Sequence, residues 1–349
     1  MEGTLPLEDA SELIQSSLAP AESEATVRRR ESVCYSPSDH ERRNPVMSNL
    51  KETGRAVARI LTSIGVVRRS LRAVARAGVL PRSMWTRLPV ATTFRVPTSE
   101  GRSFAYASVM SDNIGRALFW RDLRDWEPET VSVFVTLARR ARWFLDVGAN
   151  TGAYTLIALA ENSALHAVSF EPVPHIFDRM RENLTINGFG SRCSARREAV
   201  SDFEGHARLH VPDTVLPTSA SLDERGFRGT TGTLVDVPVT TIDAACAGRD
   251  DIDLAKIDVE GFEDKALAGM GSVLSQCAPA IVVECNPDGP FRGVEAALRV
   301  HRYRFFHLRD RGAVARDGIE PDPDEVFRNY LCLPESKLDW VPGLVTAGG

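Results

Sequence analysis

Short apolar runs alternate with segments of helical period along the C-terminal part of the chain. In chain order, the runs that predict strands are WFLDVG (143–148), LHAVSFE (165–171), SARREAVS (194–201), DLAKIDV (253–259), AIVVEC (280–285), YRFFHL (303–308) and VFRNYLCL (326–333). Apolar positions at helical spacing predict helices over 152–162, 175–187, 263–274 and 291–301. Such alternation is typical of a parallel sheet covered on both faces. The pattern therefore predicts an α/β fold with a doubly wound, seven-stranded, mostly parallel sheet over 142–333.

Other segments extend this sheet. GHARLHV and LVDVPVT predict a hairpin between the third and fourth strands, and residues 92–109 predict two strands around a turn at 99–101. Residues 116–141 are expected to be helical, with a break near Glu127–Pro128. We therefore expect 91–141 to pack on a ligand-binding domain over 142–335, followed by a tail at 336–349.

The first 90 residues differ in character from the rest. Residues 1–46 are polar, without a sustained period, and are predicted to be disordered. Residues 47–90 form a basic extension in which apolar residues recur every three or four positions over 53–77, which predicts an amphipathic helix with most arginines opposite the apolar face. The basic face could contact an anionic membrane surface or a partner; packing on the domain with a solvated basic face is the interpretation we favour. Met1 and Met47 are alternative starts.

Charge and composition exclude several classes of protein. The apolar fraction of 43% is that of a globular protein, and no run approaches the roughly 18 apolar residues that a membrane-spanning helix needs. Residues 47–90 hold nine basic and one acidic side chain, but the net charge of the whole chain is −5, so a wide nucleic-acid surface is not expected. The six cysteines form no C-x-x-C pair, which argues against zinc or a disulfide framework. Without a secretory signal pattern, the expected location is cytoplasmic.

The first predicted strand ends in a glycine turn, FLDVGANTGAYT, in which Gly148 and Gly152 flank the entry to a helix. Glycines let the backbone bend tightly and approach a ligand. The spacing departs from the G-x-G-x-x-G fingerprint of dinucleotide sites, which favours a ligand without phosphates. Glu171 closes the second strand, where its carboxylate could accept hydrogen bonds from two ribose hydroxyls. Together these features predict a nucleoside site.

Several motifs in order resemble those of the FkbM-type methyltransferases, a family of class I S-adenosylmethionine enzymes. They are EPET (127–130), DVGANTGAYT (146–155), FEPVP (170–174), Asn183 and Asn187 in ENLTIN, EAVSD (198–202) with Gly205, VPVTTID (237–243) and KIDVEGFE (256–263). The resemblance covers roughly 93–333 and implies the class I Rossmann-like fold with an N-terminal helical extension.

The resemblance also implies a set of cofactor contacts. S-adenosylmethionine would lie with its methionine part near Asp146, Gly148, Ala149, Asn150 and Gly152. Glu171, followed by Pro172, would hold the ribose. Ser201 and Asp202 would lie near the adenine, although a turn aspartate needs no ligand to explain it.

The fourth strand carries the candidate chemistry. Period-two alternation places Lys256, Asp258 and Glu260 on one side, and buried charge is costly unless it is paired or used. Asp258 and Glu260 are the candidates for a general base that takes the proton of an acceptor hydroxyl, whereas a purely structural ion pair with Lys256 is the alternative. Asp258, Glu284 and Asn286 also resemble the set that some O-methyltransferases use for Mg²⁺, an option that we do not favour.

The function that these features predict is transfer of a methyl group from S-adenosylmethionine to a hydroxyl of a small molecule, sugar or glycan. The alternatives are a nucleic-acid methyltransferase, for which NPDG (286–289) gives faint support, and a non-catalytic binding protein. A nicotinamide dehydrogenase is disfavoured by the glycine spacing. Acceptor specificity is expected in 203–235, 309–325 and the N-terminal helix.

Overall fold

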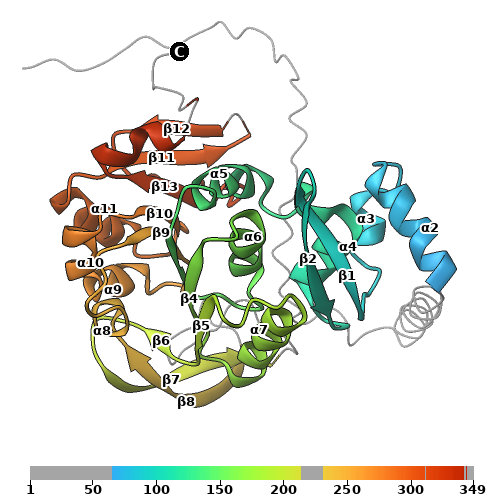
Figure 1. Cartoon of the computed structure of the whole chain (residues 1–349), viewed down its shortest axis with the longest axis horizontal. Coiled ribbons are helices and arrows are strands. Elements are labelled where there is room, and N and C mark those ends of the chain that lie inside the picture. Colours follow the sequence, from blue (N-terminus) through green and yellow to red (C-terminus); the bar gives the residue numbers. More distant parts are fainter. Residues whose placement is uncertain (1–64, 214–230, 311, 342, 344–349) are drawn as a thin grey trace, which may run out of the picture. The chain divides into compact units, whose positions relative to one another are not determined.

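The computed structural model describes residues 65–213, 231–310, 312–341 and 343 (Figure 1). The predicted disorder of 1–46, the first part of the predicted helix at 53–77 and the end of the tail at 336–349 lie outside these residues. No helix of the described part is long and apolar enough to cross a membrane.

The centre of the fold is an eight-stranded sheet in the order β12-β11-β13-β10-β9-β3-β4-β5. Its strands are β3 (Trp143–Val147), β4 (His166–Phe170), β5 (Cys193–Arg196), β9 (Ile252–Ile257), β10 (Ala280–Glu284), β11 (Arg304–Arg309), β12 (Gly312–Arg316) and β13 (Asn329–Leu333). Strands β5, β4, β3, β9 and β10 run parallel, and β13 is inserted antiparallel between β10 and β11. The doubly wound α/β prediction is therefore confirmed.

The predicted number of strands was one too low. Strand β12 pairs antiparallel with β11 from Arg309↔Gly312 to Phe305↔Arg316, within a segment that was expected to be a loop. Its sequence, GAVAR, is too short and too poor in large apolar side chains to give a strand signal of its own.

Alternation along the strands separates two apolar cores, one on each face of the sheet. Phe144, Leu254 and Leu331 point to one core, whereas Leu145, Ala255 and Cys332 point to the other. The first core contains residues of the helices that precede and follow β3, and the second contains residues of the helices around β10. The helices of the first core are α4 (Asn113–Arg121), α5 (Pro128–Ala138), α6 (Ala153–Glu161) and α7 (Pro174–Ile186). The helices of the second core are α8 (Ile242–Ala245), α9 (Glu263–Ala268), α10 (Gly271–Gln276) and α11 (Phe291–Val300).

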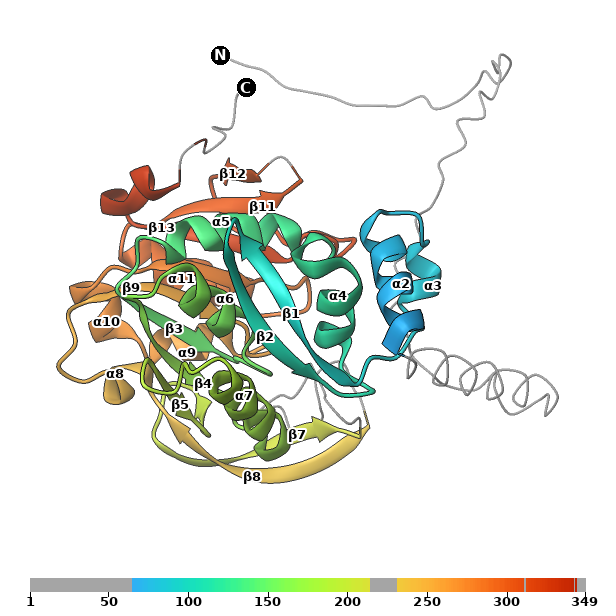
Figure 2. The same cartoon turned by 45° about the vertical axis from the view of Figure 1, so that its right-hand side comes forward.

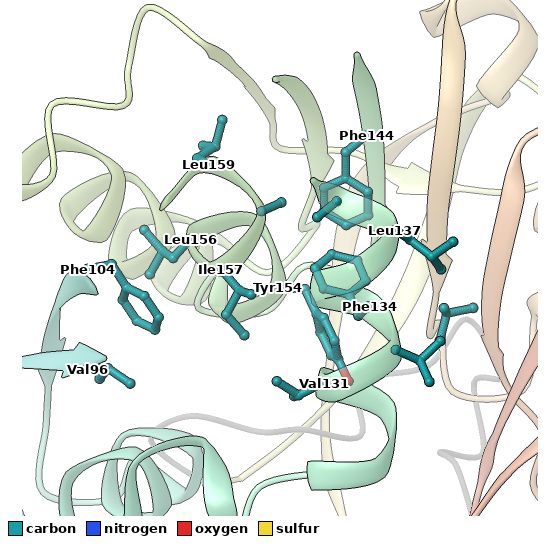
Figure 3. Packing of buried hydrophobic residues seen from close by; sticks show 14 of the residues in the cluster. Val96, Phe104, Val131, Phe134, Leu137, Phe144, Tyr154, Leu156, Ile157 and Leu159 are labelled. Atoms are coloured by element: carbon teal, nitrogen blue, oxygen red, sulfur yellow. The ribbon is translucent and has the colours of Figure 1, made fainter. Parts of the chain in front are cut away.

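The hairpin of β1 (Thr92–Ser99) and β2 (Arg102–Ser108) packs on α4, α6 and α7, beside the first core (Figure 2). Figure 3 shows Val96 and Phe104 of this hairpin facing Leu156 and Ile157 of α6, with Phe134 of α5 nearby. The hairpin is thus built into the fold.

The predicted strand at 194–201 divides in the structure. Its first part is β5 in the main sheet, and its second part is β6 (Ala199–Val200), which joins β7 (Gly205–Pro212) and β8 (Gly232–Thr240) in a separate three-stranded sheet of order β6-β8-β7. Strands β7 and β8 are antiparallel, which confirms the hairpin predicted between the third and fourth strands.

Helix α2 (Gly65–Arg76), followed by the short α3 (Arg82–Trp85), forms the described part of the basic extension, and two of its arginines are not on a solvated face. Arg72 and Arg76 face the domain rather than solvent. The Arg72 guanidinium lies 4.5 Å from the centre of the Phe119 ring and donates to the Phe119 carbonyl at 2.7 Å. Arg76 forms an ion pair with the buried Asp122. A flat guanidinium can stack on an aromatic ring and satisfy a buried acid together, so these arginines belong to the packed side of the helix.

Candidate active site

The strand order reverses at β3, between β4 and β9, and the glycine turn lies at the carboxyl end of β3. The amides of Gly148 and Ala149 donate to the Phe170 carbonyl at 3.1 and 2.8 Å, which joins this turn to the end of β4. Gly148 has φ +83, and a Cβ there would lie 1.8 Å from the Asp258 carbonyl oxygen at the end of β9. Only glycine fits this position, so the three strand ends meet at one point.

Asp146 lies beneath the turn and does not line the pocket described below. Its carboxylate accepts from the Thr155 amide at 3.0 Å and from the Thr155 hydroxyl at 2.6 Å, which anchors the first turn of α6. Burial raises the pKa of Asp146 to about 6. In this structure Asp146 thus contacts the helix that follows the glycine turn, and its predicted contact with a ligand stays a prediction.

Glu171 lies beside the same turn. Its two carboxylate oxygens accept from the Asn150 amide at 3.0 Å and the Val173 amide at 2.8 Å. Burial raises the pKa of Glu171 to about 7, although both amides oppose that rise. A carboxylate fixed by two backbone amides is a preorganised acceptor for hydroxyl groups.

A pocket opens across these strand ends. Together with its open mouth, where part of the space is open solvent, it spans about 580 Å³. Its lining residues are Gly148, Asn150, Phe170, Glu171, Pro172, Ile176, Glu198, Ala199, Val200, Leu209, Asp258, Val259, Glu260 and Phe262. It joins the glycine turn to Glu171 on one side and to Asp258 and Glu260 on the other.

The apolar end of the pocket differs from the sequence prediction in detail. Ala199, Val200 and Leu209 line it, together with Glu198, which the sequence reasoning did not single out. Ser201 and Asp202 come directly after these residues and are not among the lining residues. The Asp202 carboxylate accepts from Lys265 Nζ at 3.0 Å. The signal for Glu198 was present in the EAVSD motif, whose first residue it is.

Lys256 and Asp258 form an ion pair at the other end of the pocket. Lys256 Nζ donates to Asp258 Oδ2 at 3.0 Å, and the Lys256 side chain is buried. Burial acts to raise the pKa of Asp258, but the Lys256 ammonium, a hydrogen bond with Glu284 and the charge of Arg328 together hold that pKa below its ordinary value. The pKa of Lys256 is correspondingly above its ordinary value despite burial, mainly because of Asp258. Asp258 is therefore ionised.

A second ion pair lies beside the first. Arg328 Nη1 is 2.8 Å from Glu284 Oε1, and Asn286 Nδ2 donates to Glu284 Oε2 at 3.1 Å. Burial and the charge of Asp258 raise the pKa of Glu284 well above its ordinary value. Arg328 was not expected from the sequence, because it precedes β13 and reaches the cluster only through the antiparallel insertion of that strand.

Glu127 links this cluster to the segment before the sheet. Its Oε2 accepts from the Tyr154 hydroxyl at 2.6 Å and from Asn329 Nδ2 at 3.0 Å. Lys256 Nζ lies 5.4 Å from the centre of the Tyr154 ring. Glu127 has φ +44, a conformation that is costly for a residue with a side chain and that is often found at functional sites. The EPET motif was the only sequence signal for it.

Carboxylate oxygens of Asp258, Glu260 and Glu284 all lie within 4.8 Å of one another, and oxygen donors of this kind suit Mg²⁺. Two of the three carboxylates, however, already bind the cationic groups of Lys256 and Arg328. A divalent ion would compete with these two side chains. The residues therefore fit Mg²⁺ poorly, and we derive no step through a metal.

Comparison with known proteins shows which family the chain resembles. The Methyltransferase FkbM domain matches residues 146–310, which include the glycine turn, Glu171 and the Lys256–Asp258 pair. The 31-O-demethyl-FK506 methyltransferase FkbM of Streptomyces tacrolimicus is 30% identical over 193 residues, which are 47% of this chain and 74% of that protein. The methyltransferase sdnD of Sordaria araneosa is 27% identical over 217 residues, which are 52% of this chain and 78% of that one.

Solved structures resemble the chain more distantly. The methyltransferase FkbM of Methylobacillus flagellatus is 15% identical with a TM-score of 0.36, over 57% of this chain and 47% of that one. An S-adenosylmethionine-dependent methyltransferase of Agrobacterium tumefaciens is 12% identical with a TM-score of 0.36, over 70% of each chain. The first match spans less than half of the solved chain, and neither bears on the activity. The domain match and the identity with the Streptomyces enzyme show that the chain belongs to the FkbM family of methyltransferases.

Proposed function

We propose that this protein transfers a methyl group from S-adenosylmethionine to a hydroxyl oxygen of a small molecule or sugar. The observation that carries the proposal is the single pocket that joins Glu171, at the end of β4, to Asp258, at the end of β9, across the turn at Gly148. The name of the Streptomyces relative describes an O-methyltransferase of a small molecule, which supports oxygen as the acceptor atom.

Cofactor binding would use the side of the pocket nearest β4. Glu171 would accept hydrogen bonds from the ribose hydroxyls, because its carboxylate is held in place by the Asn150 and Val173 amides. The apolar side chains of Ile176, Val200 and Leu209 would enclose the adenine. The bound sulfonium supplies the methyl group.

The acceptor would lie at the opposite side, near Asp258 and Glu260. A lone pair of the acceptor oxygen forms the new C–O bond while the C–S bond breaks and its electrons return to sulfur. The proton of the hydroxyl passes to a carboxylate. We assign that role to Asp258, because Lys256 keeps it ionised and because it lies against the glycine turn. Glu260, which also lines the pocket, would contact the acceptor. Much of the acceleration would come from holding the reactants in line.

The proposal is tested in two steps. Calorimetry with S-adenosylhomocysteine should show binding to the wild-type protein and much weaker binding to Glu171→Ala. A screen of hydroxylated metabolites with labelled S-adenosylmethionine should then find an acceptor, with Asp258→Asn slower by about 10²–10⁴-fold. Glu182→Gln, which changes an exposed carboxylate of α7, is the control. A wild-type protein that does not bind S-adenosylhomocysteine would overturn the proposal.

A further inference from the structure

Thr151, in the middle of the glycine turn, is held from outside that turn. It is buried, at 1% exposure. Its hydroxyl lies 2.6 Å from the Tyr106 hydroxyl, and its carbonyl accepts from Asn183 Nδ2 at 2.9 Å. Tyr106 belongs to β2 and Asn183 to α7. Two elements that precede and follow the turn therefore fix one residue within it.

The Tyr106 contact is itself anchored. The Tyr106 hydroxyl donates to Asp112 Oδ2 at 2.9 Å, and Asp112 caps α4 by accepting from the Gly115 amide at 2.7 Å. Since the one hydroxyl proton of Tyr106 goes to Asp112, the Thr151 hydroxyl donates to Tyr106. All three side chains are buried, so the network is rigid and moving one member costs the others their partners.

The Asn183 contact has a close counterpart on the same helix. Asn187, one turn further along α7, bonds the amide and the carbonyl of Ala105 in β2, both at 2.7 Å. Asn183 accepts from the Ala107 amide at 2.8 Å and gives its own amide hydrogens to Thr151 instead. Both side chains thus satisfy the edge of β2, which has no third strand in its sheet. Of these two asparagines, Asn183 is the one that also bonds the glycine turn.

The position of Thr151 bears on the predicted ribose site through its neighbour. The Asn150 amide donates to Glu171 at 3.0 Å, and Asn150 has φ +50, a left-handed conformation that its surroundings must maintain. A turn free to relax at Thr151 would lose that conformation and release the Glu171 carboxylate. Strand β2 and helix α7 therefore help to hold the Glu171 carboxylate in place, through hydrogen bonds to Thr151 and from the neighbouring Asn150 amide.

We propose that β2 and α7 contribute to the cofactor site through Tyr106 and Asn183, two positioning residues that hold the glycine turn in its binding conformation. The inference rests on the proposed function, because it takes the ligand of the turn to be the methyl donor. It assigns to Tyr106 and Asn183 a role in affinity and not only in packing.

The test compares matched variants by calorimetry with S-adenosylhomocysteine. Asn183→Ala should weaken binding by about tenfold or more, the equivalent of a hydrogen bond between buried groups. Asn187→Ala loosens the same strand edge but leaves Thr151 untouched, so its dissociation constant should stay within about threefold of wild type. Equal effects of the two variants would overturn the inference. A wild-type protein without affinity would instead overturn the proposed function, and the inference with it.

Two further variants separate positioning from stability. Asn183→Asp keeps the acceptor for the Ala107 amide but loses the donor to Thr151, so it should bind as weakly as Asn183→Ala; binding like that of wild type would contradict the inference. Tyr106→Phe should also weaken binding by about tenfold. Its control is Tyr303→Phe, which removes another buried tyrosine hydroxyl bond, to the Pro279 carbonyl, on the opposite core. If both tyrosine variants lose thermal stability alike but only Tyr106→Phe loses affinity, the positioning role holds. Equal loss of affinity overturns it.

Discussion

Lys256 Nζ lies 3.0 Å from Asp258 Oδ2, and the two side chains differ in exposure: 1% for Lys256 and 31% for Asp258. The ammonium group is therefore sealed inside the protein, whereas the carboxylate that it stabilises reaches the pocket. A buried positive charge beside a carboxylate keeps that carboxylate ionised without blocking access to it. This arrangement determines how the proposed proton transfer should depend on pH.

Replacing Lys256 with Met should shift the acid limb of the pH–rate profile to higher pH. The folded-state pKa of Asp258 is lowered, so its stabilising contribution is present above its unfolded pKa and is lost as pH falls through the folded value. Without the ammonium that pKa rises, and Asp258 becomes protonated at a higher pH. The dependence of kcat/KM on pH, measured with the acceptor found in the screen, checks this. An unmoved acid limb would assign the proton transfer to another group.

Affinity for S-adenosylhomocysteine should rise with pH through about 7. Burial raises the pKa of Glu171 to about 7, and only the ionised carboxylate can accept from both ribose hydroxyls. The folding stability of the protein without ligand should change with pH in the opposite direction from the affinity. A carboxyl with a raised folded-state pKa contributes stability below its unfolded pKa, and this contribution is lost as pH rises through 7. Calorimetry between pH 5 and pH 9 measures the affinity. Glu171→Gln should bind weakly with a flatter profile, which separates Glu171 from Asp146 and Glu263, whose raised pKa values are about 6 and about 7.

Methyl transfer should survive EDTA. Lys256 and Arg328 already bind the two carboxylates that a divalent ion would need. The measurement is the rate before and after dialysis against the chelator, with calorimetric titration of MgCl₂ into the protein as an independent readout. Loss of activity that Mg²⁺ restores, together with heat of Mg²⁺ binding that Glu260→Gln removes, would establish the metal site and refute this prediction.

Gly148→Ala should be far more destabilising than Gly188→Ala. Both glycines have positive φ, so both substitutions carry the strain of the left-handed conformation, on the order of 1–2 kcal/mol. A Cβ at Gly188 would meet no atom within 4 Å, whereas a Cβ at Gly148 would lie 1.8 Å from the Asp258 carbonyl oxygen. Urea unfolding of the two variants gives the difference directly. Equal losses would mean that the turn can move away from β9.

The sequence predicted those parts of the site that depend on local order. The glycine turn, Glu171 and Lys256 each follow or lie on a strand with a clear apolar pattern, and parallel strands bring their carboxyl ends to the same edge. The relation between Glu171 and the Asn150 amide follows from this arrangement. The sequence alone left Asp258 and Glu260 as equal candidates, and our proposal of Asp258 rests on the position of the Lys256 amine, which only the structure shows.

Contacts between segments that are distant in the chain could not be predicted from the sequence. Arg328 meets Glu284 because β13 runs antiparallel to β10, and no local signal encodes that pairing. The inward position of Arg72 depends on two aromatic rings presented by other elements. The division of the third predicted strand into β5 and β6 likewise depends on β8, which supplies the partner for β6. In each case tertiary contacts outweigh the local pattern.

The insertion of β13 between β10 and β11 affects the order in which contacts near the acidic cluster can form during synthesis. Asn329, at the start of that strand, donates to Glu127, 202 residues earlier in the chain. The last strand of the sheet to be synthesised therefore contacts a residue that precedes the first strand of that sheet. During translation, Lys256 and Asp258 leave the ribosome before Arg328 and Asn329. The ion pair of Arg328 with Glu284 and the hydrogen bond of Asn329 with Glu127 can therefore form only after the last strand of the sheet has been made.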